Sequence, residues 1–157
     1  MGYLISKEYI AGFFDGEGWI CITRHLPYKK HKQKNLVYHL RIGIENTDLD
    51  VLKKIQKRYK GNIYTRKKRR ALNRKITHLW YLNGNNASDF LLDIKEFLII
   101  KKKQANLAIK YQRHIQKYMR KNPNFRDRGL SKETLKFREN IVQQIRKLNS
   151  NNLIWLK

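Results

Sequence analysis

Two acids stand among glycines near the start of the chain, in the segment IAGFFDGEG that covers residues 10–18. Asp15 and Glu17 flank Gly16, although lysine and arginine dominate the rest of the sequence. Two neighbouring carboxylates and the backbone carbonyl of a glycine turn supply the oxygen ligands that Mg²⁺ prefers. Mg²⁺ held between protein carboxylates and phosphate oxygens promotes phosphodiester cleavage. The segment therefore predicts chemistry on a phosphate group.

Small residues precede and surround these acids. Ala11, Gly12, Asp15 and Gly16 share one face of the expected helix, because positions i, i+1, i+4 and i+5 cluster there. A face this small lets another backbone approach closely, and the same helix of a second copy would bring both sets of acids together. In the alternative interpretation the small residues serve a crowded contact within the chain, and both acids are solvated.

The charge of the chain indicates a polyanionic partner. Lys and Arg number 36 against 12 Asp and Glu in 157 residues, which gives a formal charge of +24. Nucleic acid is the commonest polyanionic partner of such a protein. No apolar run approaches the roughly 20 residues that span a bilayer, and no signal peptide is evident. The single cysteine, Cys21, excludes an internal disulfide. It suits an intracellular, reducing compartment, whether cytoplasm, nucleoid or organelle.

Periodicity predicts where helices and strands lie. Ser6 is expected to cap a first helix that stops near Gly16 and Gly18. Alternation in the second strand points Tyr38, Leu40, Ile42 and Ile44 to one side. The expected strands cover residues 19–24, 36–45, 62–66 and 76–82, and the later helices cover residues 49–60, 87–100, 102–120 and 131–148.

This order predicts an α+β fold of one αββαββα core, with a four-stranded antiparallel sheet. Helices are expected on one face of the sheet, while the other face carries polar side chains and is free to meet a partner. Residues 1–120 form the expected core, and residues 121–157 form a helical extension of the same domain.

Three segments in register resemble one known family. IAGFFDGEG resembles the signature of the LAGLIDADG homing endonucleases, with Ile10 for leucine and Glu17 for the last acid. IENTD at residues 44–48 and FLIIKKKQANL at residues 97–107 resemble two further segments of the family. The resemblance covers about residues 3–115 and includes one signature motif, as in the homodimeric members.

The resemblance implies a role for several residues. Glu17 and the Gly16 carbonyl would bind catalytic Mg²⁺ or Mn²⁺, and Asp15 would support the helix end. The helix face of Ala11, Gly12, Asp15 and Gly16 would form the dimer interface.

Two further positions carry an implied catalytic role. Asp48 aligns with a residue that positions the attacking water, and an acid there could act as general base. Its alternative role is the N-cap of the next helix. Lys101 aligns with a base near the scissile phosphate that would stabilise transition-state charge. Lys102 or Lys103 could occupy that place instead, with Lys101 solvated.

The polar sheet face is expected to lie in the DNA major groove. Arg41 and Arg66 would read guanine, Asn62 would read adenine, and Glu45 would accept from cytosine or bond a neighbouring arginine. Phosphate contact or solvent exposure is the alternative for each, and for Trp80 a core position is a further alternative. The expected DNA contacts on the strands are Cys21, Thr23, His25, His39, Arg41, Gly43, Glu45, Asn62, Tyr64, Arg66, His78 and Trp80. Those on the loops, which would bind phosphate, are Lys29, Lys30, Lys32, Lys68, Arg69 and Arg70.

The function implied by the resemblance is site-specific cleavage of both DNA strands. A homodimer would cut a long pseudo-palindromic site across the minor groove, leaving short 3′ overhangs. The alternatives are an intron maturase that binds its host intron RNA, a DNA-binding regulator on the same fold that does not cut, and a basic structural protein. Neutralising Glu17 separates cleavage from binding.

Overall fold

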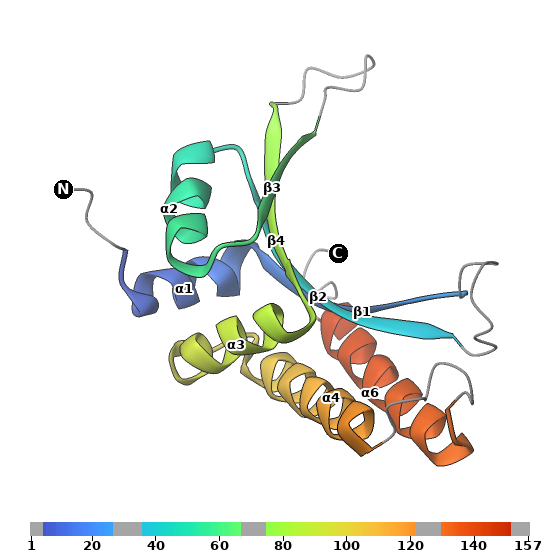
Figure 1. Ribbon diagram of the computed structural model, residues 1–157. Helices are drawn as coiled ribbons and strands as arrows, with labels where there is room; N and C mark the ends of the chain where they lie inside the picture. Colours follow the sequence, from blue (N-terminus) through green and yellow to red (C-terminus); the bar gives the residue numbers. More distant parts are fainter. Residues whose placement is uncertain (1–4, 27–35, 67–74, 122–129, 152–157) are drawn as a thin grey trace.

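The chain forms a bent antiparallel sheet with helices packed on one side, as Figure 1 shows. The computed structural model describes residues 5–26, 36–66, 75–121 and 130–151. The predicted α+β class is confirmed. The elements in chain order are α1 (Lys7–Glu17), β1 (Gly18–His25), β2 (Val37–Asn46), α2 (Leu49–Tyr59), β3 (Asn62–Arg66), β4 (Thr77–Asn83), α3 (Gly84–Ile94), the 3₁₀ turn η1 (Lys95–Phe97), α4 (Lys102–Lys121) and α6 (Lys132–Asn151).

Local sequence signals account for most of these boundaries. The Ser6 hydroxyl accepts a hydrogen bond from the Tyr9 N–H and begins α1 as predicted. Ser131 caps α6 in the same way, through the N–H of Thr134. After α2 the chain reverses at Lys60 and Gly61, which both have positive φ.

The strand order is β1-β2-β4-β3, and every neighbouring pair is antiparallel. The predicted alternation of β2 is confirmed, because Tyr38, Leu40, Ile42 and Ile44 are all buried on the helical side. Phe90 of α3 packs there against the rings of Phe14 and Trp80. Each buried aliphatic or aromatic side chain of this core contributes about 1.5–3 kcal/mol to folding.

The sequence misplaced both ends of α3. The helix begins at Gly84, three residues before the expected start, and it ends at Ile94, six residues before the expected end. Asn85 does not cap the helix, because its side-chain oxygen accepts hydrogen bonds from Gln112 and Gln116 of α4. The chain leaves the helix early because the backbone N–H groups of residues 99–101 bond to α1 instead.

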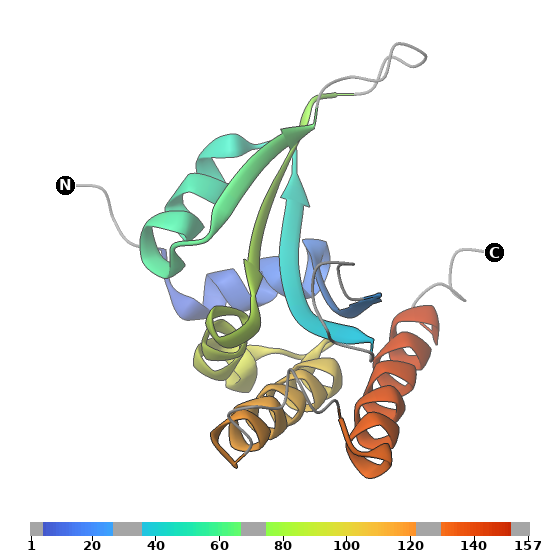
Figure 2. The ribbon, with the colours of Figure 1, turned by 45° about the vertical axis from the view of Figure 1, so that its right-hand side comes forward.

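Helix α6 covers the outer edge of β1. The Asn149 side chain donates a hydrogen bond to the Ile20 carbonyl at 3.1 Å, and Glu139 accepts from Arg24 and Tyr38. Figures 1 and 2 both show α4 and α6 side by side beneath the same end of the sheet. Helix α6 therefore satisfies one backbone acceptor on this edge of the sheet. Among the described helices, none has both the length and the hydrophobicity that a membrane span requires.

Candidate functional site

The end of α1 carries the two motif acids in different environments. Asp15 is only 7% exposed, and its carboxylate accepts three backbone hydrogen bonds. Its Oδ2 accepts from the N–H of Ile99 at 2.6 Å and of Ile100 at 3.1 Å, and its Oδ1 accepts from the N–H of Lys101 at 2.9 Å. These N–H groups precede α4, so Asp15 caps the positive end of that helix.

Lys101 completes this connection from the other direction. Its Nζ donates a hydrogen bond to the Asp15 carbonyl, at the negative end of α1. Burial lowers the pKa of the Lys101 ammonium below its usual value, while the charges of Asp15 and Glu17 oppose that shift. We call this arrangement the Asp15–Lys101 clamp. It holds a cation beside the end of α1, where Glu17 lies.

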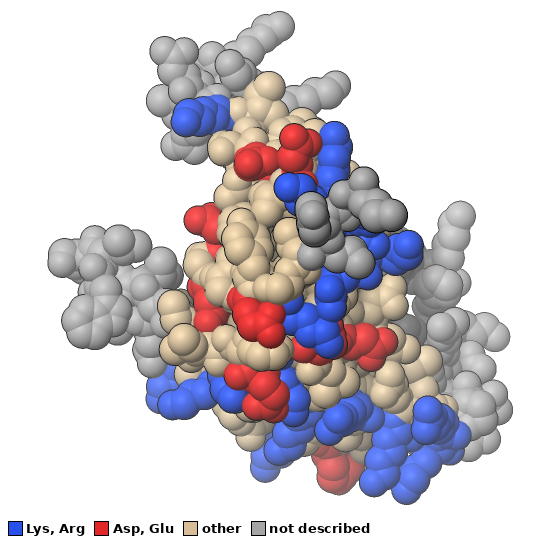
Figure 3. Space-filling view, turned by 90° about the vertical axis from the view of Figure 1, so that its left-hand side faces the viewer, with Lys and Arg blue, Asp and Glu red and all other residues tan. Residues whose placement is uncertain are grey.

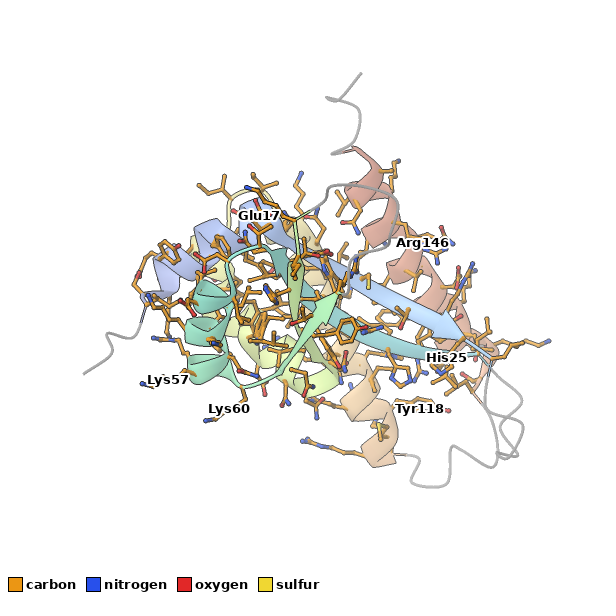
Figure 4. All side chains as sticks on the ribbon, turned by 90° about the horizontal axis from the view of Figure 1, so that it is seen from above. Glu17, His25, Lys57, Lys60, Tyr118 and Arg146 are labelled. Atoms are coloured by element: carbon orange, nitrogen blue, oxygen red, sulfur yellow. The ribbon has the colours of Figure 1, made fainter. Side chains whose placement is uncertain are left out.

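Glu17 is the last residue of α1, and it is exposed. Within the described residues no hydrogen bond or ion pair engages its carboxylate, which is thus free to bind a ligand. Figure 4 looks down on the sheet and shows Glu17 where β1 begins. In that view His25 and Arg146 lie farther along β1 and α6, and Lys57 and Lys60 project from the side of α2.

Asp48 performs the helix-capping role that the sequence offered as one alternative. Its carboxylate accepts from the N–H of Asp50 at 2.9 Å and of Val51 at 3.2 Å, at the start of α2. Gly18 of β1 pairs with Ile44 of β2 across the sheet. Glu17 directly precedes β1 and Asp48 follows β2, so both acids lie at the same end of the sheet. Asp48 is exposed there. Its role in positioning water stays a prediction.

The strand register defines which side chains share the uncovered side of the sheet. Directly opposed residues of antiparallel strands project to the same side. The positions opposed to Arg41 are Cys21 and Asn83, and the position opposed to Asn62 is Tyr81. We call this side the open face. Its described members are Trp19, Cys21, Thr23, His25, Val37, His39, Arg41, Gly43, Glu45, Asn62, Tyr64, Arg66, Thr77, Leu79, Tyr81 and Asn83.

Three residues that were expected to contact DNA from the sheet do not lie exposed on the open face. Trp80 is completely buried on the helical side, where its Nε1 donates to the Lys60 carbonyl at 2.8 Å. His78 shares that side, and its Nδ1 lies 2.9 Å from the Thr65 hydroxyl. Gly43 is on the open face but is buried beneath the Trp19 indole, which a Cβ at Gly43 would approach to 2.5 Å. None of the three therefore presents a side chain on the open face.

Sequence reasoning missed the residues that β4 contributes to the open face. They are Thr77, Leu79, Tyr81 and Asn83. The apolar pair Trp80 and Leu82, two residues apart, was the signal that even positions of this strand face the core. Tyr81 lies beneath the Arg41 guanidinium, and Asn83 accepts from the Arg41 Nε at 3.2 Å. Both residues therefore orient an arginine that the sequence did predict.

Two further features shape the open face. The rings of His25 and His39 stack with centroids 5.1 Å apart, and burial, His25 and Arg41 together lower the pKa of His39. Glu45 lies on the same face and pairs with Arg66. The expected phosphate contacts Lys29, Lys30, Lys32, Lys68, Arg69 and Arg70 lie outside the described residues.

The family model of the LAGLIDADG endonuclease matches residues 10–83, a range that holds most of α1 and all four strands. Over this range, which is a little under half of its length, the chain is similar to the LAGLIDADG endonuclease family. No curated protein matches it in sequence.

Solved LAGLIDADG structures share the fold. The homing endonuclease I-CvuI, in complex with its target in the presence of calcium, has a TM-score of 0.67 at 20% identity, covering 90% of this chain and 80% of that chain. The archaeal intron-encoded homing endonuclease I-Vdi141I, complexed with DNA, has a TM-score of 0.68 at 16% identity, covering 90% and 82%. The homing endonuclease I-GzeII, in complex with a DNA target, has a TM-score of 0.60 at 17% identity, covering 92% of this chain and 43% of that chain.

Helix α1 does not present Ala11, Gly12, Asp15 and Gly16 as one open surface. Ala11 is completely buried and Asp15 nearly so, both within the chain's own core. Gly12 and Gly16 are exposed, and a Cβ added at either would meet no atom within 4 Å. Ala11 thus serves the alternative role of a crowded internal contact, whereas Asp15 is buried and not solvated as that alternative expected. Of the four residues, only the two glycines are open to a second copy.

The oxygen atoms at this helix end suit a hard divalent cation but are too few in one chain. Within the described part of the chain no cluster of three or more His, Cys, Asp and Glu side chains is suited to hold a metal ion. Asp15 is occupied by backbone N–H groups, so one chain offers the Glu17 carboxylate and the Gly16 carbonyl. Mg²⁺ is usually held by one or two carboxylates together with phosphate oxygens and water. The donor set therefore fits a site that DNA and a second helix end would complete.

Proposed function

We propose that this protein is a site-specific homing endonuclease that cleaves both strands of a long pseudo-palindromic DNA site as a homodimer with a bound divalent cation. The observation that carries this proposal is the free carboxylate of Glu17, beside the clamped Lys101 and at the margin of the open face. I-CvuI was crystallised with its target and calcium, and with DNA left uncleaved in the presence of magnesium. Those structures support DNA as the partner and a divalent cation as the cofactor, and we propose Mg²⁺ or Mn²⁺ for this role.

Each group of this chain has a defined task in that reaction. Glu17 and the Gly16 carbonyl would hold the cation, which when bound supplies positive charge to the reacting phosphate. Lys101 adds a cation that the clamp keeps beside Glu17. Its lowered pKa reflects burial, which strengthens its attraction to a phosphate. Asp48 would orient or deprotonate water from the adjoining end of the sheet.

Two copies are required because one chain contains one motif, whereas a double-strand break needs two sites. Figure 3 shows that acidic and basic side chains are mixed on the face that holds α1 and α2, so two chains of high positive charge can meet there. Beside Glu17, Ile99 is 88% exposed and Ile100 is 58% exposed. Burying these side chains and the exposed Gly12 and Gly16 would give a partner helix a close apolar contact. I-GzeII supports this arrangement, because its chain is long enough for two units of this size.

Residues 121–157 are proposed to extend the same domain. The described helix there, α6, packs on both α4 and β1, and its Ile141, Val142 and Ile145 are buried in the shared core. The extension would thus hold the outer strand of the DNA-binding sheet in place.

Cleavage of a plasmid that carries the cognate site, found by selection from a randomised duplex library, tests this function. We expect linear product with Mg²⁺, none with EDTA, and none from Glu17→Gln, which should still bind the duplex. Asp89→Asn is the matched control, since Asp89 is an exposed acid on α3, on the helical side of the sheet. Specific binding without nicking by the wild type would favour a regulator or a maturase, and cleavage by Glu17→Gln at the wild-type rate would refute the assignment.

The dimer has its own test. Ile100→Glu places a charge on an exposed position and should leave the monomer folded but prevent association. Met119→Glu is the control, because Met119 is also exposed but lies near the far end of α4. Light scattering on the cognate duplex should show a dimer for wild type and the control alone. A dimer of Ile100→Glu with wild-type affinity would exclude Ile100 from the interface.

A further inference from the structure

Glu45 is the one acid among the described residues of the open face. It lies on β2, and its partners come from the two strands beyond it. Thr77 of β4 donates its hydroxyl proton to Glu45 Oε1 at 2.8 Å, and Arg66 of β3 brings its Nη1 to 3.2 Å from the same oxygen. Three strands therefore converge on one carboxylate oxygen.

This geometry leaves hydrogen-bonding capacity directed to solvent. Both contacts fall on Oε1, so Oε2 has no hydrogen bond or ion pair within the described part of the chain. The side chains of Arg66 and Glu45 remain 56% and 33% exposed. Arg66 has five N–H donors, and the ion pair engages only its Nη1. The pair thus presents donors and an acceptor side by side.

A G·C base pair offers the complementary pattern in the major groove. Guanine presents the acceptors N7 and O6, and cytosine presents the N4 amino donor next to them. In an A·T pair the adenine N7 acceptor is followed by the N6 amino donor and then by the thymine O4 acceptor, so the donor and the second acceptor are exchanged relative to G·C. We propose that Arg66 and Glu45 together read one G·C base pair in each half-site, Arg66 donating to guanine and Glu45 accepting from cytosine. This inference rests on the proposed binding of DNA by the open face.

The pair also explains why an acid persists on a surface that approaches phosphates. A carboxylate near DNA lowers affinity for every sequence, because it repels the backbone. It also keeps the Arg66 guanidinium on the sheet, where it meets base edges rather than swinging to a phosphate. Thr77 holds Glu45 in turn. The pair thus lowers the affinity for DNA of every sequence and increases discrimination between base pairs at one position.

The test is selection from a randomised duplex library, with Ca²⁺ in place of Mg²⁺, using the full chain and its variants. Wild type should enrich a G·C pair at one position of each half-site. Glu45→Gln should retain the rest of the motif, lose about 5- to 100-fold discrimination at that position, and bind non-specific duplex more tightly. Arg66→Lys keeps the positive charge but loses the planar fork, so it should lose the same preference without a gain in non-specific affinity. Asp89→Asn removes one negative charge from the helical side, and should change neither property.

The possible failures are distinguishable. If Glu45→Gln and Arg66→Lys enrich the wild-type motif at every position, the pair does not read a base and this inference is overturned, while the proposed function stands. If wild type enriches no motif at all, the proposed function fails and the inference fails with it. Since all three substituted side chains are at least partly exposed, circular dichroism melts matching wild type are expected and confirm that the variants are folded.

Discussion

Asp15→Asn is the substitution that most directly tests how the motif helix is held. The Asp15 carboxylate accepts from three backbone N–H groups that lie 84 to 86 residues away in sequence. Asparagine has almost the same shape but replaces one oxygen with an amino group and removes the charge. The single oxygen of asparagine can keep only the hydrogen bonds that one of the two carboxylate oxygens accepts. The amino group then faces a backbone N–H, from which it cannot accept a hydrogen bond.

The magnitude follows from these contacts. A hydrogen bond to a charged group contributes about 1.5–3 kcal/mol, and an anion at a helix N-terminus adds about 0.3–1 kcal/mol. Losing one such bond, weakening the others and leaving a buried N–H unsatisfied should together cost about 3 kcal/mol. Domains are stable by only about 5–15 kcal/mol, so the effect would be large.

Urea unfolding followed by circular dichroism measures the loss, with Asp48→Asn as the matched control. Asp48 also accepts two backbone N–H bonds, but at an exposed N-cap where asparagine serves equally well. We expect the control to change the free energy of unfolding by less than about 0.5 kcal/mol. If Asp15→Asn costs no more than Asp48→Asn, the clamp does not stabilise the fold and the reasoning is refuted.

Two further predictions follow from other contacts. Gly43→Ala should reduce the free energy of unfolding by about 1–3 kcal/mol, because its Cβ would lie 2.5 Å from the Trp19 ring and 2.8 Å from the Trp80 carbonyl; a urea midpoint equal to wild type would show that the indole moves freely. Asp93→Asn should make the free energy of unfolding less dependent on pH under acidic conditions. Burial opposes ionisation of the Asp93 carboxyl, but hydrogen bonds from Lys7 and Tyr59 outweigh it and lower its pKa. Asp93 therefore stabilises the fold above its unfolded pKa of about 3.9, and this contribution is lost as the pH falls through the lower folded pKa. The free energy of unfolding, measured from pH 6 to pH 2, should fall more steeply for wild type than for Asp93→Asn. Parallel curves would contradict the assignment.

Short-range patterns were sufficient for much of the fold. The cap at Ser6 and the alternation of β2 depend only on residues a few positions apart, so the sequence predicted them correctly. The motif at residues 10–18 likewise indicated the family, because its nine residues are consecutive and can be recognised without knowledge of the fold. These features need no knowledge of which distant segment becomes a neighbour.

Pairings between distant segments were decided by the tertiary structure. The side of β4 that faces outward depends on its register with β2, and a shift of one residue exchanges the two faces. That register places Tyr81 and Asn83 outside and buries Trp80. The two motif acids also look alike in sequence, yet Asp15 is enclosed by residues 99–101 and Glu17 is left open. The packing of α1 against the start of α4 therefore decides which acid is structural and which is available for chemistry. Burial and backbone partners depend on this tertiary contact and cannot be inferred from the local sequence.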